Sequence, residues 1–103
     1  MNIVFRPNTQ GSLTVAATNV STSIALPPGG GGMTRVVNTG PGNAYVEFGP
    51  SGCNAAVPTT SPGSTCVVAN APASFFRLRP SDANVAVVAD TTASVKIARG
   101  DEV

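Results

Sequence analysis

The stretch that decides the fold is 33-MTRVVNTGPGNAYVEFG-49, where two runs of alternating apolar and polar residues flank a cluster of turn-forming residues. Residues 33–38 are expected to form one strand, and residues 39–43 combine Gly, Pro and Asn in a way typical of a turn. In the following strand we expect an inward face of Ala44, Val46 and Phe48 opposite an outward face of Tyr45 and Glu47. The stretch therefore predicts a β-hairpin.

The same alternation recurs along the chain, separated by turn-forming residues. It predicts six further strands, at residues 13–17, 20–26, 66–69, 73–79, 85–89 and 94–99. In the first of these Leu13, Val15 and Ala17 share a face, and in the second Val20, Thr22, Ile24 and Leu26 do. We expect hairpin turns at 18–19 and 90–92. Residues 27–32 are too rich in Pro and Gly for a strand and predict a flexible loop. Residues 49–65 predict a long loop of the kind that is often functional or mobile.

These strands predict an all-β fold, namely a single-domain antiparallel β-sandwich or a jelly-roll-like barrel of about seven or eight strands. At 103 residues the chain has room for one modest core. We place this domain at residues 13–103. Residues 1–12 have little to pack against and are expected to form an extended N-terminal arm.

Charge and hydropathy argue against two classes of partner. The formal net charge of +1 provides no strong field to attract nucleic acid or an anionic membrane. No window approaches the ~18 apolar residues of a spanning helix, and the first residues do not resemble a signal peptide. We therefore expect a soluble, unprocessed protein that binds neither nucleic acid nor membrane.

The residue inventory also argues against an enzyme. The chain has no histidine, which excludes a Ser-His-Asp or Cys-His arrangement. A carboxylate-pair glycosidase would need two of Glu47, Asp82 and Asp90 across a cleft, but few aromatic residues are available to stack a sugar. Two cysteines and scattered acids predict no metal site, and the glycines at 29–32 lack the Lys-Ser or Lys-Thr of a phosphate-binding loop. We expect no catalytic residue and no cofactor.

Cys53 and Cys66 bracket the long loop and form a candidate disulfide. A bridge across a loop of this size would stabilise the fold by about 3 kcal/mol in the unfolded-state entropy model. The alternative is a pair of small buried thiols, which a reducing compartment would maintain. The sequence leaves both open.

The segment 75-FFRLR-79 combines aromatic and cationic side chains within five residues. Alternation places Phe76 and Leu78 on the core face and leaves Phe75, Arg77 and Arg79 outside, where Phe and Arg can anchor an interface. The alternative is a partly covered Phe beside ordinary solubilising charges. A second candidate contact is the arm, where Val4, Phe5 and Arg6 could add a strand to a neighbouring protein.

Residues 34–40 and 44–49 resemble a hairpin of small virion structural proteins of tailed bacteriophages, and 75–78, 85–89 and 95–97 fit the same resemblance. It covers the chain from about Leu13 onward, although the 49–65 insertion with its cysteines departs from the pattern. The resemblance implies a capsid decoration (cement) protein on the capsid exterior of the virion, made in the host cytoplasm. It also implies binding to the major capsid protein and homo-oligomerisation. The alternative is a tail or head-surface module that binds a host receptor or glycan.

Overall fold

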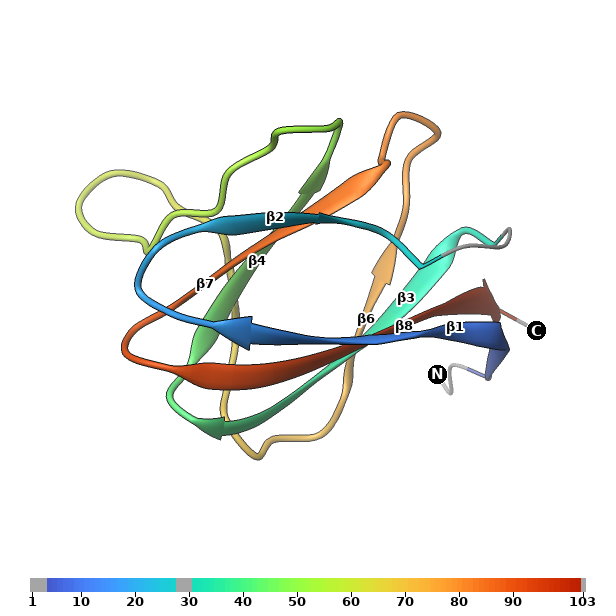
Figure 1. Ribbon diagram of the computed structural model, residues 1–103, viewed down its shortest axis with the longest axis horizontal. Coiled ribbons are helices and arrows are strands. Elements are labelled where there is room, and N and C mark those ends of the chain that lie inside the picture. Colours follow the sequence, from blue (N-terminus) through green and yellow to red (C-terminus); the bar gives the residue numbers. More distant parts are fainter. Residues whose placement is uncertain (1–3, 28–30, 103) are drawn as a thin grey trace.

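Two four-stranded antiparallel sheets pack face to face in the computed structural model, which describes residues 4–27 and 31–102 (Figure 1). No residue in these two ranges is helical, so no helix in them could cross a membrane. The strands are β1 (Phe5–Ala17), β2 (Thr22–Ala25), β3 (Met33–Pro41), β4 (Ala44–Gly49), β5 (Thr65–Val67), β6 (Ser74–Arg77), β7 (Asn84–Ala89) and β8 (Ala93–Glu102). The expected all-β sandwich is thereby confirmed.

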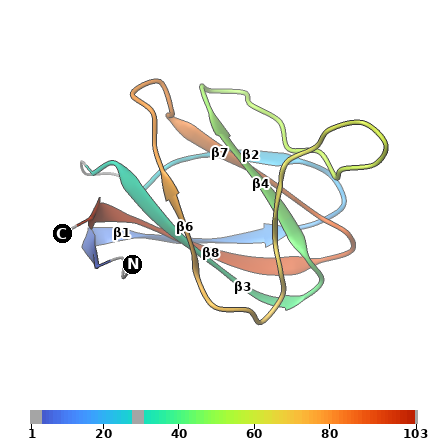
Figure 2. The same ribbon diagram turned by 180° about the vertical axis from the view of Figure 1, so that it is seen from behind.

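The strand order is β1-β8-β3-β6 in one sheet, here called sheet A, and β2-β7-β4-β5 in the other, sheet B. Every connection except β4–β5 crosses from one sheet to the other, as the views from front and back show (Figures 1 and 2). Eight strands in this interleaved order make a jelly roll, the double-sheet form of the antiparallel sandwich.

The three expected hairpins are wrong, although their turns are real. β3 lies in sheet A and β4 in sheet B, so residues 42–43 join two sheets rather than two neighbouring strands. The turns at 18–21 and 90–92 likewise connect β1 to β2 and β7 to β8 across the sandwich. A hairpin and an inter-sheet arch need the same turn residues, and both keep an alternating pattern in the flanking strands. Local sequence therefore does not separate them.

The core lies between the two sheets and consists mainly of small and β-branched side chains. Val36, Val95 and Ile97 of sheet A face Val85 and Val87 of sheet B, and all five are fully buried. The predicted inward faces are confirmed for 13–17 and 44–48, whose apolar members pack in this core or against it. The predicted face of 20–26 holds only in part, because Val20 precedes β2 and is 68% exposed.

Asn38 fixes the arch between β3 and β4. Its side chain is 1% exposed and faces inward in register with Thr34 and Val36. The amide donates to the carbonyl oxygens of Gly42 and Val67, both at 2.9 Å, while its oxygen accepts from the Gly40 N–H at 2.8 Å. One buried side chain thus satisfies backbone groups that the turn would otherwise leave without partners.

The long loop after β4 covers the outer face of sheet B. Ala86 and Val88 of β7 point away from the main core, yet both are buried because Ala55 of the loop packs on them. The loop is held by hydrogen bonds from the Ala55 N–H to Ser21 Oγ and from the Ala56 N–H to Ser64 Oγ. It therefore completes a second, smaller apolar cluster. The flexible loop expected at 27–32 includes residues 28–30, which lie outside the described part of the chain.

Candidate binding face

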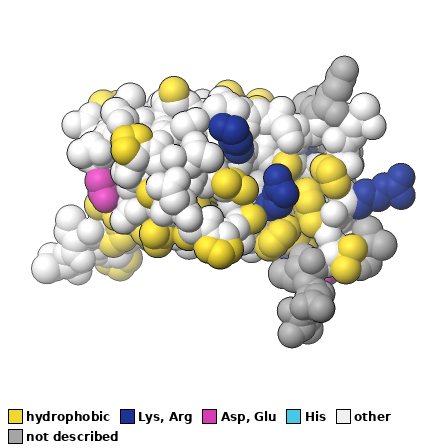
Figure 3. Space-filling view, turned by 90° about the horizontal axis from the view of Figure 1, so that it is seen from below, with side chains coloured by type: hydrophobic (Ala, Val, Ile, Leu, Met, Phe, Trp, Pro, Cys, Tyr) yellow, Lys and Arg dark blue, Asp and Glu magenta, His cyan; other side chains and the backbone are white. Residues whose placement is uncertain are grey.

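Most outward residues of sheet A are exposed, although Ala98 near the centre of this face is only 6% exposed. The outward residues of its two central strands include Arg35 and Lys96, both exposed, and β1 adds exposed Ser12, Thr14 and Ala16. Figure 3 shows this face with cationic side chains standing among apolar patches. We call this surface the sheet A face, and it is the candidate binding surface of the protein.

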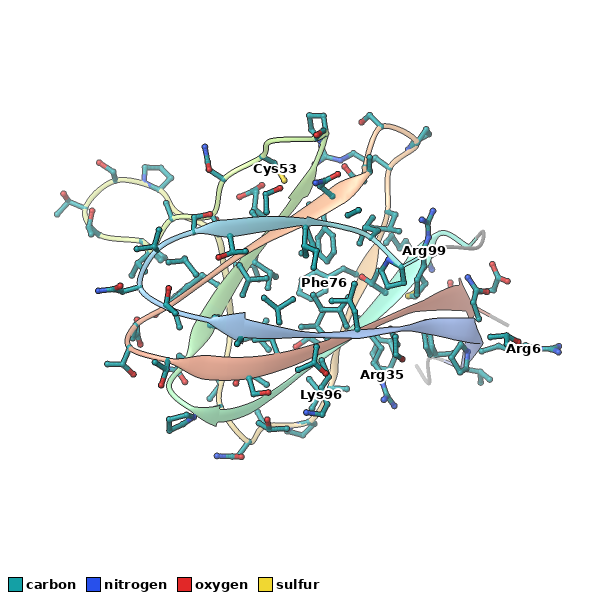
Figure 4. All side chains as sticks on the ribbon, in the orientation of Figure 1. Arg6, Arg35, Cys53, Phe76, Lys96 and Arg99 are labelled. Atoms are coloured by element: carbon teal, nitrogen blue, oxygen red, sulfur yellow. The ribbon has the colours of Figure 1, made fainter. Side chains whose placement is uncertain are left out.

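The expected arm takes part in this face. Residues 1–3 lie outside the described part, but from Phe5 onward the chain belongs to β1, with Phe5 opposite Glu102 and Pro7 opposite Gly100. The pairing with β8 is then irregular until Ser12. Val4 is 56% exposed just before the strand, and Arg6 is exposed and points away from the body of the molecule (Figure 4).

Phe5 and Phe75 meet although they are far apart in sequence. Their ring centroids are 5.8 Å apart with a tilted geometry that suits aromatic pairs. The two rings line a hollow of about 350 Å³ together with Pro7, Ser12, Arg35 and Ala98. The structure thus joins the two candidate contacts that the sequence placed on separate segments.

The segment around β6 divides its side chains as the alternation predicts. Phe76 packs against Phe48 in the core, with centroids 5.4 Å apart, and Leu78 packs on the same core (Figure 4). Arg77 forms an ion pair with Glu102, and Arg79 Nε lies 3.9 Å from Asp82 Oδ2. Both arginine side chains are largely exposed, so each pair contributes little stability.

Arg79 belongs to a different part of the surface from Phe75. It lines a hollow of about 200 Å³ at the open side of the sandwich, where Glu47 and Asp82 also lie. Asp82 accepts a hydrogen bond from the Arg79 backbone N–H at 2.8 Å, which closes the turn after β6. Arg77 also lines that hollow, and its ion-pair partner Glu102 lies opposite Phe5 in the pairing of β1 with β8.

Arg35 and Lys96 are the site residues that sequence reasoning missed. Arg35 sits in the strand that was read for its apolar alternation, and Lys96 in the last expected strand. Both side chains point away from the sandwich on the underside of Figure 4. Together they line a hollow of about 290 Å³ with Ser12 and Thr14. In the sequence, each of the two residues stands at an outward position of its alternating strand. That the two strands are neighbours is seen only in the structure.

The two cysteines are free thiols in the structure. Cys53 is half-buried, with its sulfur 4.0 Å from Ser23 Oγ and 3.9 Å from the Glu47 carbonyl oxygen. Cys66 is exposed on β5 and lies opposite Tyr45 of β4. The structure therefore places one thiol in the loop, packed against sheet B, and the other on the edge strand of sheet B.

Tyr45 joins Asp90 and Cys66 in a small polar cluster on the outer side of sheet B. Hydrogen bonding to the Asp90 carboxylate, with smaller effects of desolvation and of Cys66, raises the pKa of Tyr45 above its usual value. A raised pKa keeps the phenol neutral and able to donate. The cluster is therefore a structural contact between β4 and the turn after β7 rather than a source of tyrosinate.

The three candidate catalytic acids are engaged separately. Glu47 accepts a hydrogen bond from Ser64 Oγ at 3.0 Å, Asp82 closes the turn after β6, and Asp90 contacts Tyr45. Within residues 4–27 and 31–102, no group of three His, Cys, Asp or Glu side chains is placed to hold a metal ion. The geometry instead favours the sheet A face as the site.

Comparison of the chain with models of known protein families, with curated proteins and with solved structures finds no match.

Proposed function

We propose that this chain is a non-catalytic structural module that decorates and stabilises a bacteriophage capsid by binding across major capsid protein subunits. The observation that carries the proposal is the sheet A face, where Phe5 and Phe75 line a hollow beside exposed cations. Partly exposed aromatic residues and arginine are the residue types that anchor protein interfaces. The resemblance to small virion proteins supplies the particular partner.

The jelly-roll order supports this proposal without deciding it. Viral capsid and lectin domains both use the fold, and a fold alone does not determine function. The alternative, a tail or head-surface module that binds a receptor or glycan, would place function in the loops. In the largest loop Cys53 and Ala55 pack on sheet B, whereas residues 56–63 are exposed. The proposal places binding on the sheet A face because the partly exposed aromatic pair lies there.

A single domain of this size buries about 800 Å² in a standard contact. Tight attachment therefore follows most readily from self-association that engages several capsid subunits at once, because linked weak contacts multiply in effect. We therefore propose that the module acts as a homo-oligomer.

The experiment is co-sedimentation of purified protein with capsids assembled from the major capsid protein of the same source. The double variant Phe5→Ser with Phe75→Ser should lose most of its occupancy, by roughly 10-fold or more, because interface anchors carry most of the binding energy. Val20→Ser is the matched control, since Val20 is an exposed apolar residue on a turn remote from this face. Full occupancy of the double variant would refute the proposed surface, and absence of wild-type binding would refute capsid decoration.

A further inference from the structure

The centre of the sheet A face is a single row of residues that crosses all four strands. Arg35 of β3 lies opposite Phe75 of β6 on one side and opposite Ala98 of β8 on the other, and Ala98 lies opposite Ser12 of β1. Arg35 lines both the 290 Å³ hollow and the 350 Å³ hollow of this face. Arg35 therefore lies between a hollow that also contains Lys96 and a hollow that contains the two phenylalanines.

Lys96 strengthens the positive charge at this point. It is exposed on β8 and shares the 290 Å³ hollow with Arg35. In the pairing of β3 with β8, Lys96 lies two residues from Ala98, the residue opposite Arg35, so it is a diagonal neighbour of Arg35. Within the described residues the ion pairs join Arg77 to Glu102 and Arg79 to Asp82, and neither includes Arg35 or Lys96. The two side chains therefore present positive charge on this face without an acidic partner in the described residues.

The surroundings decide which kind of anion fits. Arg binds a carboxylate through two parallel hydrogen bonds, and the hydroxyls of Ser12 and Thr14 add polar partners in the same hollow. The neighbouring hollow, with Phe5 and Phe75, accepts an apolar side chain. Nucleic acid fits poorly, since the net charge is only +1 and phosphate-backbone binding depends on several cations.

We infer that the sheet A face binds an acidic protein segment in which a carboxylate pairs with Arg35 and Lys96 and an adjacent apolar side chain enters the Phe5–Phe75 hollow. This inference rests on the proposed function, because it specifies the chemistry of the capsid surface that the module would contact. Charge complementarity selects the occupant: a face with unpaired cations around an aromatic hollow matches acids beside an aromatic or aliphatic residue.

The test uses short synthetic peptides as probes and the full chain labelled for NMR. The probe is a capped Gly-Asp-Phe-Asp-Gly peptide, and its matched controls carry Asn in place of both Asp or Ala in place of Phe. We expect the probe to shift the amide signals of Arg35, Lys96 and Ala98, and each control to bind at least about 5-fold more weakly. Binding should weaken as salt is raised.

The protein variant for this test is Arg35→Gln with Lys96→Gln, which keeps chain length and polarity on an exposed face. It should bind the probe at least about 10-fold more weakly than the wild type. The control is Arg79→Gln, because Arg79 is an exposed arginine in the separate hollow of about 200 Å³. This variant should bind the probe as the wild type does. Circular dichroism confirms that each variant is folded. Equal binding of the Asn peptide, or unchanged binding by the double glutamine variant, would overturn the inference.

Two other occupants have their own signatures. If the same amides shift on raising the protein concentration alone, a second copy of the chain occupies the face and the inference is wrong. Tighter binding of a short DNA duplex than of the acidic peptide would also overturn it. Capsid binding distinguishes the two proposals. If the double glutamine variant binds capsids as well as the wild type does, only the inference of an acidic partner segment is contradicted. If the wild type binds the peptide but no capsid, only capsid decoration is contradicted.

Discussion

At the scale of single residues, Asn38 is the buried polar group on which the β3–β4 arch depends. Along β3 the inward positions are Thr34, Val36 and Asn38, so Asn38 is buried because of the alternation of the strand. Its three hydrogen bonds all go to backbone groups of the arch and of β5. A side chain without an amide at this position would leave a buried donor and two buried acceptors without partners.

Asn38→Ala should therefore lower the free energy of unfolding by roughly 3 kcal/mol, since each unsatisfied buried polar group costs about 1–3 kcal/mol and relaxation recovers part of the loss. Urea unfolding followed by circular dichroism measures the change. The neighbouring Thr39→Ala serves as the control, because Thr39 is exposed and makes a single hydrogen bond to the Ser94 carbonyl oxygen. A similar small loss in both variants would show that Asn38 does not hold the arch.

At the scale of elements, the start of β1 is pressed closely against the end of β8. A Cβ added to Gly100 would lie 2.0 Å from the Arg6 carbonyl oxygen and 2.8 Å from the Pro7 Cα. These are backbone atoms, which cannot rotate away as a side chain can. Phe5, whose ring contacts Phe75, directly precedes this close approach, so we expect Gly100 to be needed for the aromatic hollow.

Gly100→Ala should separate the two strands locally and destabilise the fold by about 1–3 kcal/mol, the usual cost of overpacking. The Phe5–Phe75 ring contact should also disappear, which is measured as the loss of nuclear Overhauser effects between the two rings. Gly32→Ala is the matched control, because no atom lies within 4 Å of a Cβ built there. Retention of the ring contact in Gly100→Ala at wild-type stability would contradict this account of β1.

Strand existence could be predicted from sequence, and strand partnership could not. Alternation correctly assigned the inward face of β4, because period-two burial is a local property. Whether residues 42–43 lead to the same sheet or the opposite one depends on contacts with β8 and β7, which local sequence does not encode. The same limit hid the site: Phe5 and Phe75 come together only through the order β1-β8-β3-β6.

At the scale of the whole molecule, the two outer faces of the sandwich differ in what covers them. The loop after β4 packs on sheet B and buries Ala86 completely, while Ala16 on the outer side of sheet A stays exposed. Sequence composition suggested a loop that is functional or mobile, because Pro, Gly, Ser and Thr carry little apolar surface. Ala55 and Cys53 supply enough of it to close the second cluster. The open face is thereby the one left for a partner.

This asymmetry predicts opposite responses to the same substitution on the two faces. Ala86→Asp should lower the free energy of unfolding by about 3 kcal/mol or more, because the loop would trap an unpaired carboxylate in an apolar cluster. Ala16→Asp adds the same group to an exposed strand position and should cost about 1 kcal/mol or less. Chemical unfolding of both variants measures the difference. If Ala86→Asp were tolerated as well as Ala16→Asp, sheet B would be as open as sheet A, and the argument that selects the sheet A face for binding would fail.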